Sequence, residues 1–159
     1  MDRFTARDAP FGPAEFRAFA EDGFVLWQRF LTAHALASLR RDVDAALRAK
    51  HPAVDAEWMQ NVHQFEAGAW MWRLASSPGI VEAARLVVGG GPVILYGSQI
   101  AVRMPRTTAM SSSATRRLDT TPWHQDGPGA RVATFWITLD RCDQRTGSLE
   151  VLAGGHTQG

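Results

Sequence analysis

The chain has little cysteine and no long hydrophobic run. Cys142 is the only cysteine among the 159 residues, so no internal disulfide can form, and a lone thiol suits a reducing compartment. No stretch reaches the roughly 18 apolar residues of a membrane span. The start at Met1 has no basic segment that leads into an apolar one. We therefore expect a cytoplasmic protein that does not enter a membrane.

The chain also lacks an excess of charge of one sign. Its 17 basic and 16 acidic residues leave a formal net charge of +1, and the basic residues gather only in short pairs such as Arg40-Arg41 and Arg116-Arg117. Nucleic acid is therefore not an expected partner. A content of 45% hydrophobic and 21% charged residues is typical of a soluble globular protein. The length predicts a single domain over residues 1–159.

Residues 1–91 are predicted to be mostly helical. A short helix is expected over Pro13 to Ala20, stopped near Gly23, followed by an extended segment at Phe24 to Trp27. Thr32 is placed to cap a longer helix that runs to about Lys50, and another helix is expected from Pro78 to Val88. The longer helix has an apolar stripe at spacings of three and four residues, formed by Leu36, Leu39, Val43 and Leu47.

Residues 92–159 are predicted to be rich in β-strands. Side chains alternate along Pro92 to Met104 and again along Val132 to Leu139, and shorter strands are expected at about Thr120 to Gln125 and Ser148 to Leu152. Helices followed by antiparallel strands predict an α+β fold. In this fold, N-terminal helices pack on a jelly-roll type of barrel.

The segment Thr121-Pro122-Trp123-His124-Gln125-Asp126-Gly127 carries the strongest chemical signal. Residues i and i+2 of a strand project to the same face, so His124 and Asp126 can bind one ion together. A histidine and a carboxylate are two of the three ligands in the triad that holds ferrous iron and leaves open positions. The sequence therefore predicts part of an iron site.

Four segments in the same order and spacing resemble the phytanoyl-CoA dioxygenase family. The first two are Asp22-Gly23-Phe24-Val25-Leu26 and Tyr96-Gly97-Ser98-Gln99 leading into Val102-Arg103-Met104. The third is the His-x-Asp segment with Trp136 about twelve positions further on. The fourth is the run from Thr146 to His156. The resemblance covers roughly residues 14–159.

The resemblance implies an iron(II)- and 2-oxoglutarate-dependent oxygenase on a double-stranded β-helix, acting on a small-molecule substrate. His124 and Asp126 would bind iron(II), and the intact Asp126 implies hydroxylation, because halogenating relatives replace this carboxylate with a small residue. The expected co-substrate residues are Gln99, Arg103, Trp136 and, on the same strand face as Trp136, Thr134. Simpler interpretations remain: a solvated Arg103, a core Trp136, and a hydrogen-bonded structural pair of His124 and Asp126.

The sequence departs from the family pattern in its last ligands. The family's third iron-binding histidine and its 2-oxoglutarate-binding arginine lie beyond the Gly-Gly-His loop, and no residues here match them. His156 corresponds to a loop histidine that does not bind iron in relatives. Only about four of the eight jelly-roll strands are found after residue 92. We therefore expect the N-terminal portion of such an enzyme, inactive by itself.

One consequence and two alternatives follow from this partial pattern. A jelly roll that lacks its C-terminal strands leaves open sheet edges, which predict self-association. The alternatives to an oxygenase are a catalytically inactive remnant and a cupin-like module that uses His124 and Asp126 with another metal such as zinc.

Overall fold

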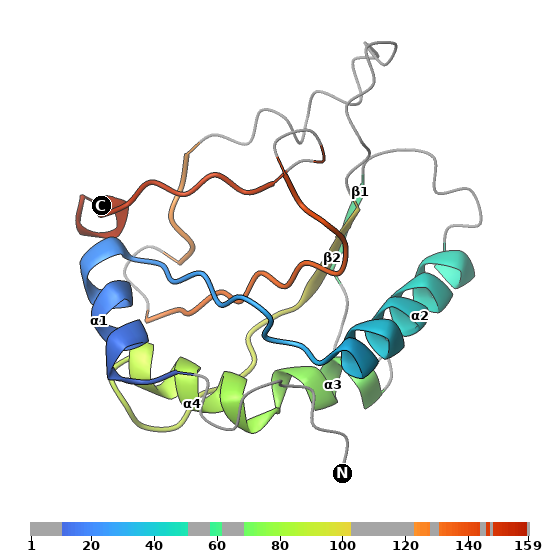
Figure 1. The fold of residues 1–159 in the computed structure, drawn as a ribbon, viewed down its shortest axis with the longest axis horizontal. Coiled ribbons are helices and arrows are strands. Elements are labelled where there is room, and N and C mark those ends of the chain that lie inside the picture. Colours follow the sequence, from blue (N-terminus) through green and yellow to red (C-terminus); the bar gives the residue numbers. More distant parts are fainter. Residues whose placement is uncertain are drawn as a thin grey trace.

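The computed structural model describes residues 11–50, 58–61, 69–102, 123–127, 131–143, 146 and 148–158 (Figure 1). Helices dominate the first part of this range, and extended segments dominate the second. The elements are α1 (Pro13–Asp22), α2 (Ala33–Lys50), β1 (Trp58–Asn61), α3 (Ala69–Ala75), α4 (Pro78–Val87), β2 (Gln99–Val102) and the 3₁₀ turn η1 (Gly155–Thr157). No described helix has the length and apolar character that crossing a bilayer would require.

Local signals define the ends of the first two helices. The backbone N–H of Gly12 donates to the Glu15 carboxylate at 3.1 Å, which satisfies a donor that a helix start leaves unpaired. Gly23 ends α1 with φ of 79°, a left-handed conformation that glycine adopts without a steric penalty. The Thr32 hydroxyl accepts from the Ala35 N–H at 3.1 Å at the start of α2. The predicted Thr32 cap is confirmed, and α1 runs two residues beyond its predicted end.

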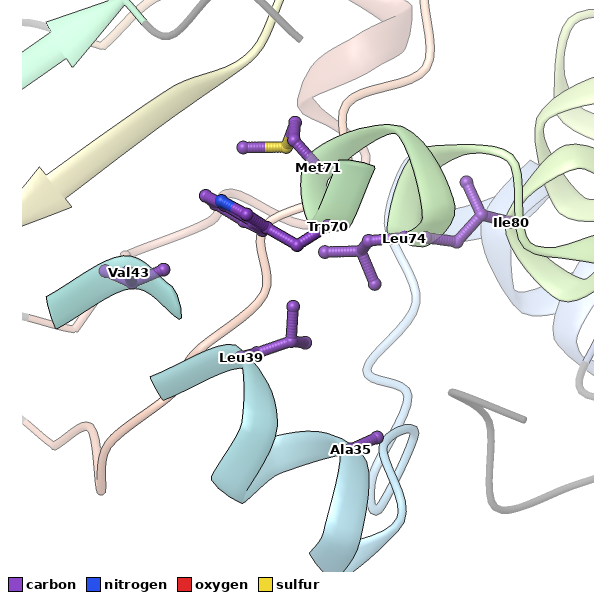
Figure 2. Packing of buried hydrophobic residues seen from close by; sticks show 7 residues of the cluster. All are labelled: Ala35, Leu39, Val43, Trp70, Met71, Leu74 and Ile80. Carbon is purple, nitrogen blue, oxygen red and sulfur yellow. The ribbon is translucent and has the colours of Figure 1, made fainter. Parts of the chain in front are cut away.

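A hydrophobic cluster between α2, α3 and α4 forms the largest described core (Figure 2). Ala35, Leu39 and Val43 follow one another at four-residue spacing, so they form one stripe on α2. Leu39 is the most deeply buried of them, with 1% of its surface exposed. The stripe faces side chains from α3 and α4, which are Trp70, Met71, Leu74 and Ile80. The predicted stripe was right for Leu39 and Val43, and Leu47 packs against the cluster.

Sequence reasoning missed α3 and β1. The α3 helix is only seven residues long, and a helix this short is not stable by itself in water. Trp70, Met71 and Leu74 are all buried, so contact with α2 and α4 stabilises α3. β1 pairs antiparallel with β2, with Trp58 opposite Val102 and Asn61 opposite Gln99. β1 has only four residues, and a pattern this short is difficult to recognise.

Most predicted strands do not form hydrogen-bonded sheet in the described residues. The strand predicted over Pro92 to Met104 is reduced to β2, since 92–98 do not belong to a described strand and 103–104 lie outside the described range. Three more predicted strands are wrong as paired strands: Val132 to Leu139, Ser148 to Leu152 and Phe24 to Trp27. The same holds for the described end of the strand predicted at Thr120 to Gln125. Alternation favours an extended chain, but a strand needs a neighbour to accept its backbone hydrogen bonds.

The predicted alternation is present in the segment 131–139 except at Phe135, which is 36% exposed. Ala133, Ile137 and Leu139 are partly buried, whereas Thr134 and Trp136 are exposed. Ile137 and Leu139 pack against the helical cluster. In Figure 1 this segment crosses the space between α1 and the β1–β2 pair. The extended chain is thus fixed to the helical core by one face, and its other face remains available.

Candidate metal site

The two predicted iron ligands lie close together. His124 Nε2 is 3.6 Å from Asp126 Oδ1, and both belong to a short bend, Trp123 to Gly127, that ends at a left-handed glycine with φ of 60°. The two side chains are 59% and 54% exposed. The predicted convergence of these side chains is confirmed, although the described backbone here is a bend and not a paired strand.

The spacing of the two side chains fits a shared ion. Metal–nitrogen and metal–oxygen bonds are about 2.0–2.2 Å long, so two ligand atoms on one ion lie about 3.0 Å apart at a right angle and about 3.6 Å apart at an angle near 120°. The observed 3.6 Å falls inside that range. An imidazole nitrogen and a carboxylate oxygen are also the donor types found in ferrous sites. The pair is therefore suited to hold a divalent metal.

A third side chain contacts the pair from the neighbouring segment. The Thr134 hydroxyl donates to Asp126 Oδ2 at 2.7 Å, the length of a strong hydrogen bond to a carboxylate. The carboxylate of Asp126 thus has one oxygen near His124 and the other held by Thr134. Sequence analysis placed Thr134 near the site but did not identify this bond, because the contact depends on how two separate segments pack.

Gln125 lies between the two ligands and is held by a different segment. Its Nε2 donates to the carbonyl oxygen of Gly155 at 2.8 Å. The turn that contains Gly155 is fixed in turn to α1, because Gly154 N–H donates to the Asp22 carbonyl at 2.8 Å. The segment that carries His124 and Asp126 is therefore connected to the C-terminal end of α1 (Figure 1).

His156 is placed at α1 and not at the candidate site. Its Nε2 lies 3.2 Å from the carbonyl oxygen of Ala20, and its ring packs so closely on Gly23 that a Cβ atom there would overlap it. These contacts agree with the expectation that His156 does not bind iron. In the described part of the chain, no three histidine, cysteine or acidic side chains gather in a metal-binding group.

The remaining predicted site residues are less closely connected. Gln99 is exposed at the start of β2, and Trp136 is exposed two residues after Thr134. Arg103 lies outside the described residues. A cavity of about 390 Å³ lies at the end of α4, lined by Val87, Val88, Gly89, Arg131 and Val132, and it does not include the ligand pair. The structure thus brings together His124, Asp126 and Thr134, and convergence of Gln99 and Trp136 on them stays a prediction.

Comparison with known families identifies the chain. A histidine and a carboxylate that converge on one exposed side define a candidate mononuclear metal centre. The profile of the phytanoyl-CoA dioxygenase (PhyH) family matches residues 19–159. The chain belongs to this family, whose members are Fe(II)- and 2-oxoglutarate-dependent oxygenases. No curated protein and no solved structure shows a significant match.

Proposed function

We propose that this protein is an iron(II)- and 2-oxoglutarate-dependent dioxygenase that hydroxylates a small organic substrate, with His124 and Asp126 as metal ligands. The convergence of His124 Nε2 and Asp126 Oδ1, 3.6 Å apart, carries the proposal. Membership of an oxygenase family favours iron over the zinc of a cupin-like module. A third protein ligand is required, and the described residues supply two.

The protein's part in the reaction is to hold and orient the reactants. Iron with 2-oxoglutarate supplies the oxidising chemistry, and the protein supplies ligands, geometry and a shaped pocket. His124 and Asp126 approach one another from the same bend and are more than half exposed. A metal ion held by His124 and Asp126 would therefore be accessible to co-substrate and substrate.

The co-substrate residues extend this site along two segments. We propose that Gln99, Arg103 and Trp136 contact 2-oxoglutarate, with Trp136 providing an aromatic wall and the other two providing polar groups. We keep Thr134 among the proposed co-substrate residues, because it is exposed and lies two residues before Trp136. A few converging polar groups beside an apolar wall are typical of small-molecule sites.

The fold proposed for this function is a jelly roll with helices packed against it. The alternating exposure of residues 136–139 supports it, because period-two burial is what a barrel strand produces. Under this proposal residues 1–159 form one domain. A cytoplasmic location and self-association through open sheet edges also stay predictions.

Binding measurements separate the oxygenase from its alternatives. We expect 2-oxoglutarate to bind, by calorimetry without oxygen, only when Fe(II) or Mn(II) is present, and we expect His124→Ala to abolish this binding. Metal binding with no metal-dependent binding of 2-oxoglutarate would favour the cupin-like module. If neither binds, the chain is an inactive remnant, and the proposal is wrong.

Turnover by the 159-residue chain alone is expected to be very low. Two protein ligands hold iron less firmly than three. No residue matches the family's 2-oxoglutarate-binding arginine, and loss of such a buried charge-assisted contact costs several kcal/mol of binding free energy. The measurement is succinate formation with iron, ascorbate and 2-oxoglutarate. Robust turnover that His124→Ala abolishes would contradict this expectation and would show that a partner subunit or another histidine of the chain completes the site.

A further inference from the structure

We infer that Thr134 is a positioning residue that fixes which oxygen of Asp126 faces the metal. The inference rests on the proposed function, because it treats Asp126 as a ligand. Thr134 was expected only to line the co-substrate pocket. The structure instead directs its hydroxyl to Asp126 Oδ2 at 2.7 Å, while Oδ1 is the oxygen 3.6 Å from His124 Nε2.

The hydrogen bond divides the two carboxylate oxygens between two tasks. A carboxylate can bind a metal through one oxygen or through both. Because Oδ2 accepts the hydrogen bond from the Thr134 hydroxyl, Oδ1 is left as the oxygen that shares the metal with His124. Binding through one oxygen uses one position on the ion, so more positions stay open for co-substrate and oxygen. Thr134 therefore favours the open arrangement that an oxygenase needs.

Thr134 is well placed for this task because its segment is fixed to the core. Ile137 and Leu139 are partly buried and pack against the cluster formed by α2, α3 and α4. Thr134 lies on the exposed side of the same extended segment. The bond to Asp126 therefore connects an exposed ligand to the helical core. Hydrogen-bond partners of metal ligands commonly change metal affinity by 10- to 100-fold when they are removed.

The test measures the affinity of the 159-residue protein for Co(II), with Co(II) alone as the probe. Thr134→Val removes the hydroxyl and keeps the shape, and we expect it to weaken binding about tenfold. Thr134→Ser keeps the hydroxyl and should bind within about twofold of the unmodified protein. Thr138→Val is the matched control, since Thr138 is an exposed threonine of the same segment, and it should leave the affinity unchanged.

Two further measurements guard against a purely structural effect. The visible spectrum of bound Co(II) reports its coordination, and we expect it to change in Thr134→Val and not in Thr138→Val. Thr134→Ala removes the same hydroxyl with a smaller side chain, so it must weaken binding as much as Thr134→Val does. Equal midpoint temperatures of thermal unfolding for the variants would confirm that the site and not the fold has changed.

The outcomes distinguish this inference from the function on which it rests. Binding lost in His124→Ala but unchanged in Thr134→Val and Thr134→Ala overturns the positioning role and leaves the ligand pair in place. Binding unchanged in all three variants overturns the ligand pair, and the role of Thr134 with it. Weakened binding in both Thr134 variants, restored by Thr134→Ser, supports the inference.

Discussion

The helical part of the molecule and the part that carries the candidate site differ in how they are held. Leu39 and the side chains around it are buried between three helices (Figure 2). In the second part, which is the described chain after residue 91, large apolar side chains are exposed, and Tyr96 has 93% of its surface exposed. Buried apolar surface is the main source of folding free energy. Stability therefore comes mostly from the helices, and the site depends on a few contacts with them.

Those few contacts can be named. Ile137 and Leu139 pack on the helical cluster, Gln125 bonds to the Gly155 carbonyl, and Gly154 bonds to the end of α1. Ile137 and Leu139 contact the helices directly, whereas Gln125 is connected to α1 through the C-terminal turn. The comparison predicts that substitutions in the helical core change the stability of the whole molecule. Substitutions at exposed positions of the second part should have little effect.

The largest expected effect is at Leu39. Replacing a buried leucine by alanine leaves a cavity, so Leu39→Ala should lower the free energy of unfolding by roughly 3–4 kcal/mol. The matched control is Leu152→Ala in the exposed second part, which should cost about 0.5 kcal/mol or less. Urea denaturation measures both. Similar losses for the two variants would show that the two regions share the stability.

A smaller effect is expected where the C-terminal turn meets α1. Gly23→Ala places a methyl group at a positive φ and onto the His156 ring, so it should cost roughly 2–3 kcal/mol. Gly90 also has a positive φ but open space around it, so Gly90→Ala should cost only about 1 kcal/mol. If His156→Ala does not relieve the extra cost of Gly23→Ala, the packing of His156 on α1 is wrong.

The smallest effect is expected at the ion pair between Arg40 of α2 and Asp140. Both side chains are more than half exposed, and exposed ion pairs contribute about 0–1 kcal/mol. Arg40→Ala should therefore change the free energy of unfolding by less than about 0.5 kcal/mol. A loss near that of Leu39→Ala would mean that this contact, and not apolar packing, joins the two regions.

The sequence predicted the helices better than the strands, and the reason is the range of the signals. Thr32 and Gly23 act on their own helix ends, and the stripe through Leu39 and Val43 lies within one helix. A strand depends on a partner elsewhere in the chain. The alternation over Val132 to Leu139 agrees with the exposure of Thr134 and Trp136, but Phe135 on the opposite face is exposed as well. Alternation also could not supply a hydrogen-bonded neighbour.

The site was predictable to the same extent. The i, i+2 spacing predicted that the His124 and Asp126 side chains lie on one face, and the structure places them together. The bond from Thr134 to Asp126 joins residues eight apart, and the one from Gln125 to Gly155 joins residues thirty apart. Neither has a local pattern that could have revealed it, because each arises from the packing of separate segments.

The central claim is that His124 and Asp126 bind one metal ion, and anomalous diffraction from crystals grown with Mn(II) tests it most directly. We expect one strong peak within about 2.0–2.3 Å of both His124 Nε2 and Asp126 Oδ1, weakened or absent in crystals of His124→Ala. A peak elsewhere in the molecule, or the two side chains on opposite faces of their segment, would contradict the claim.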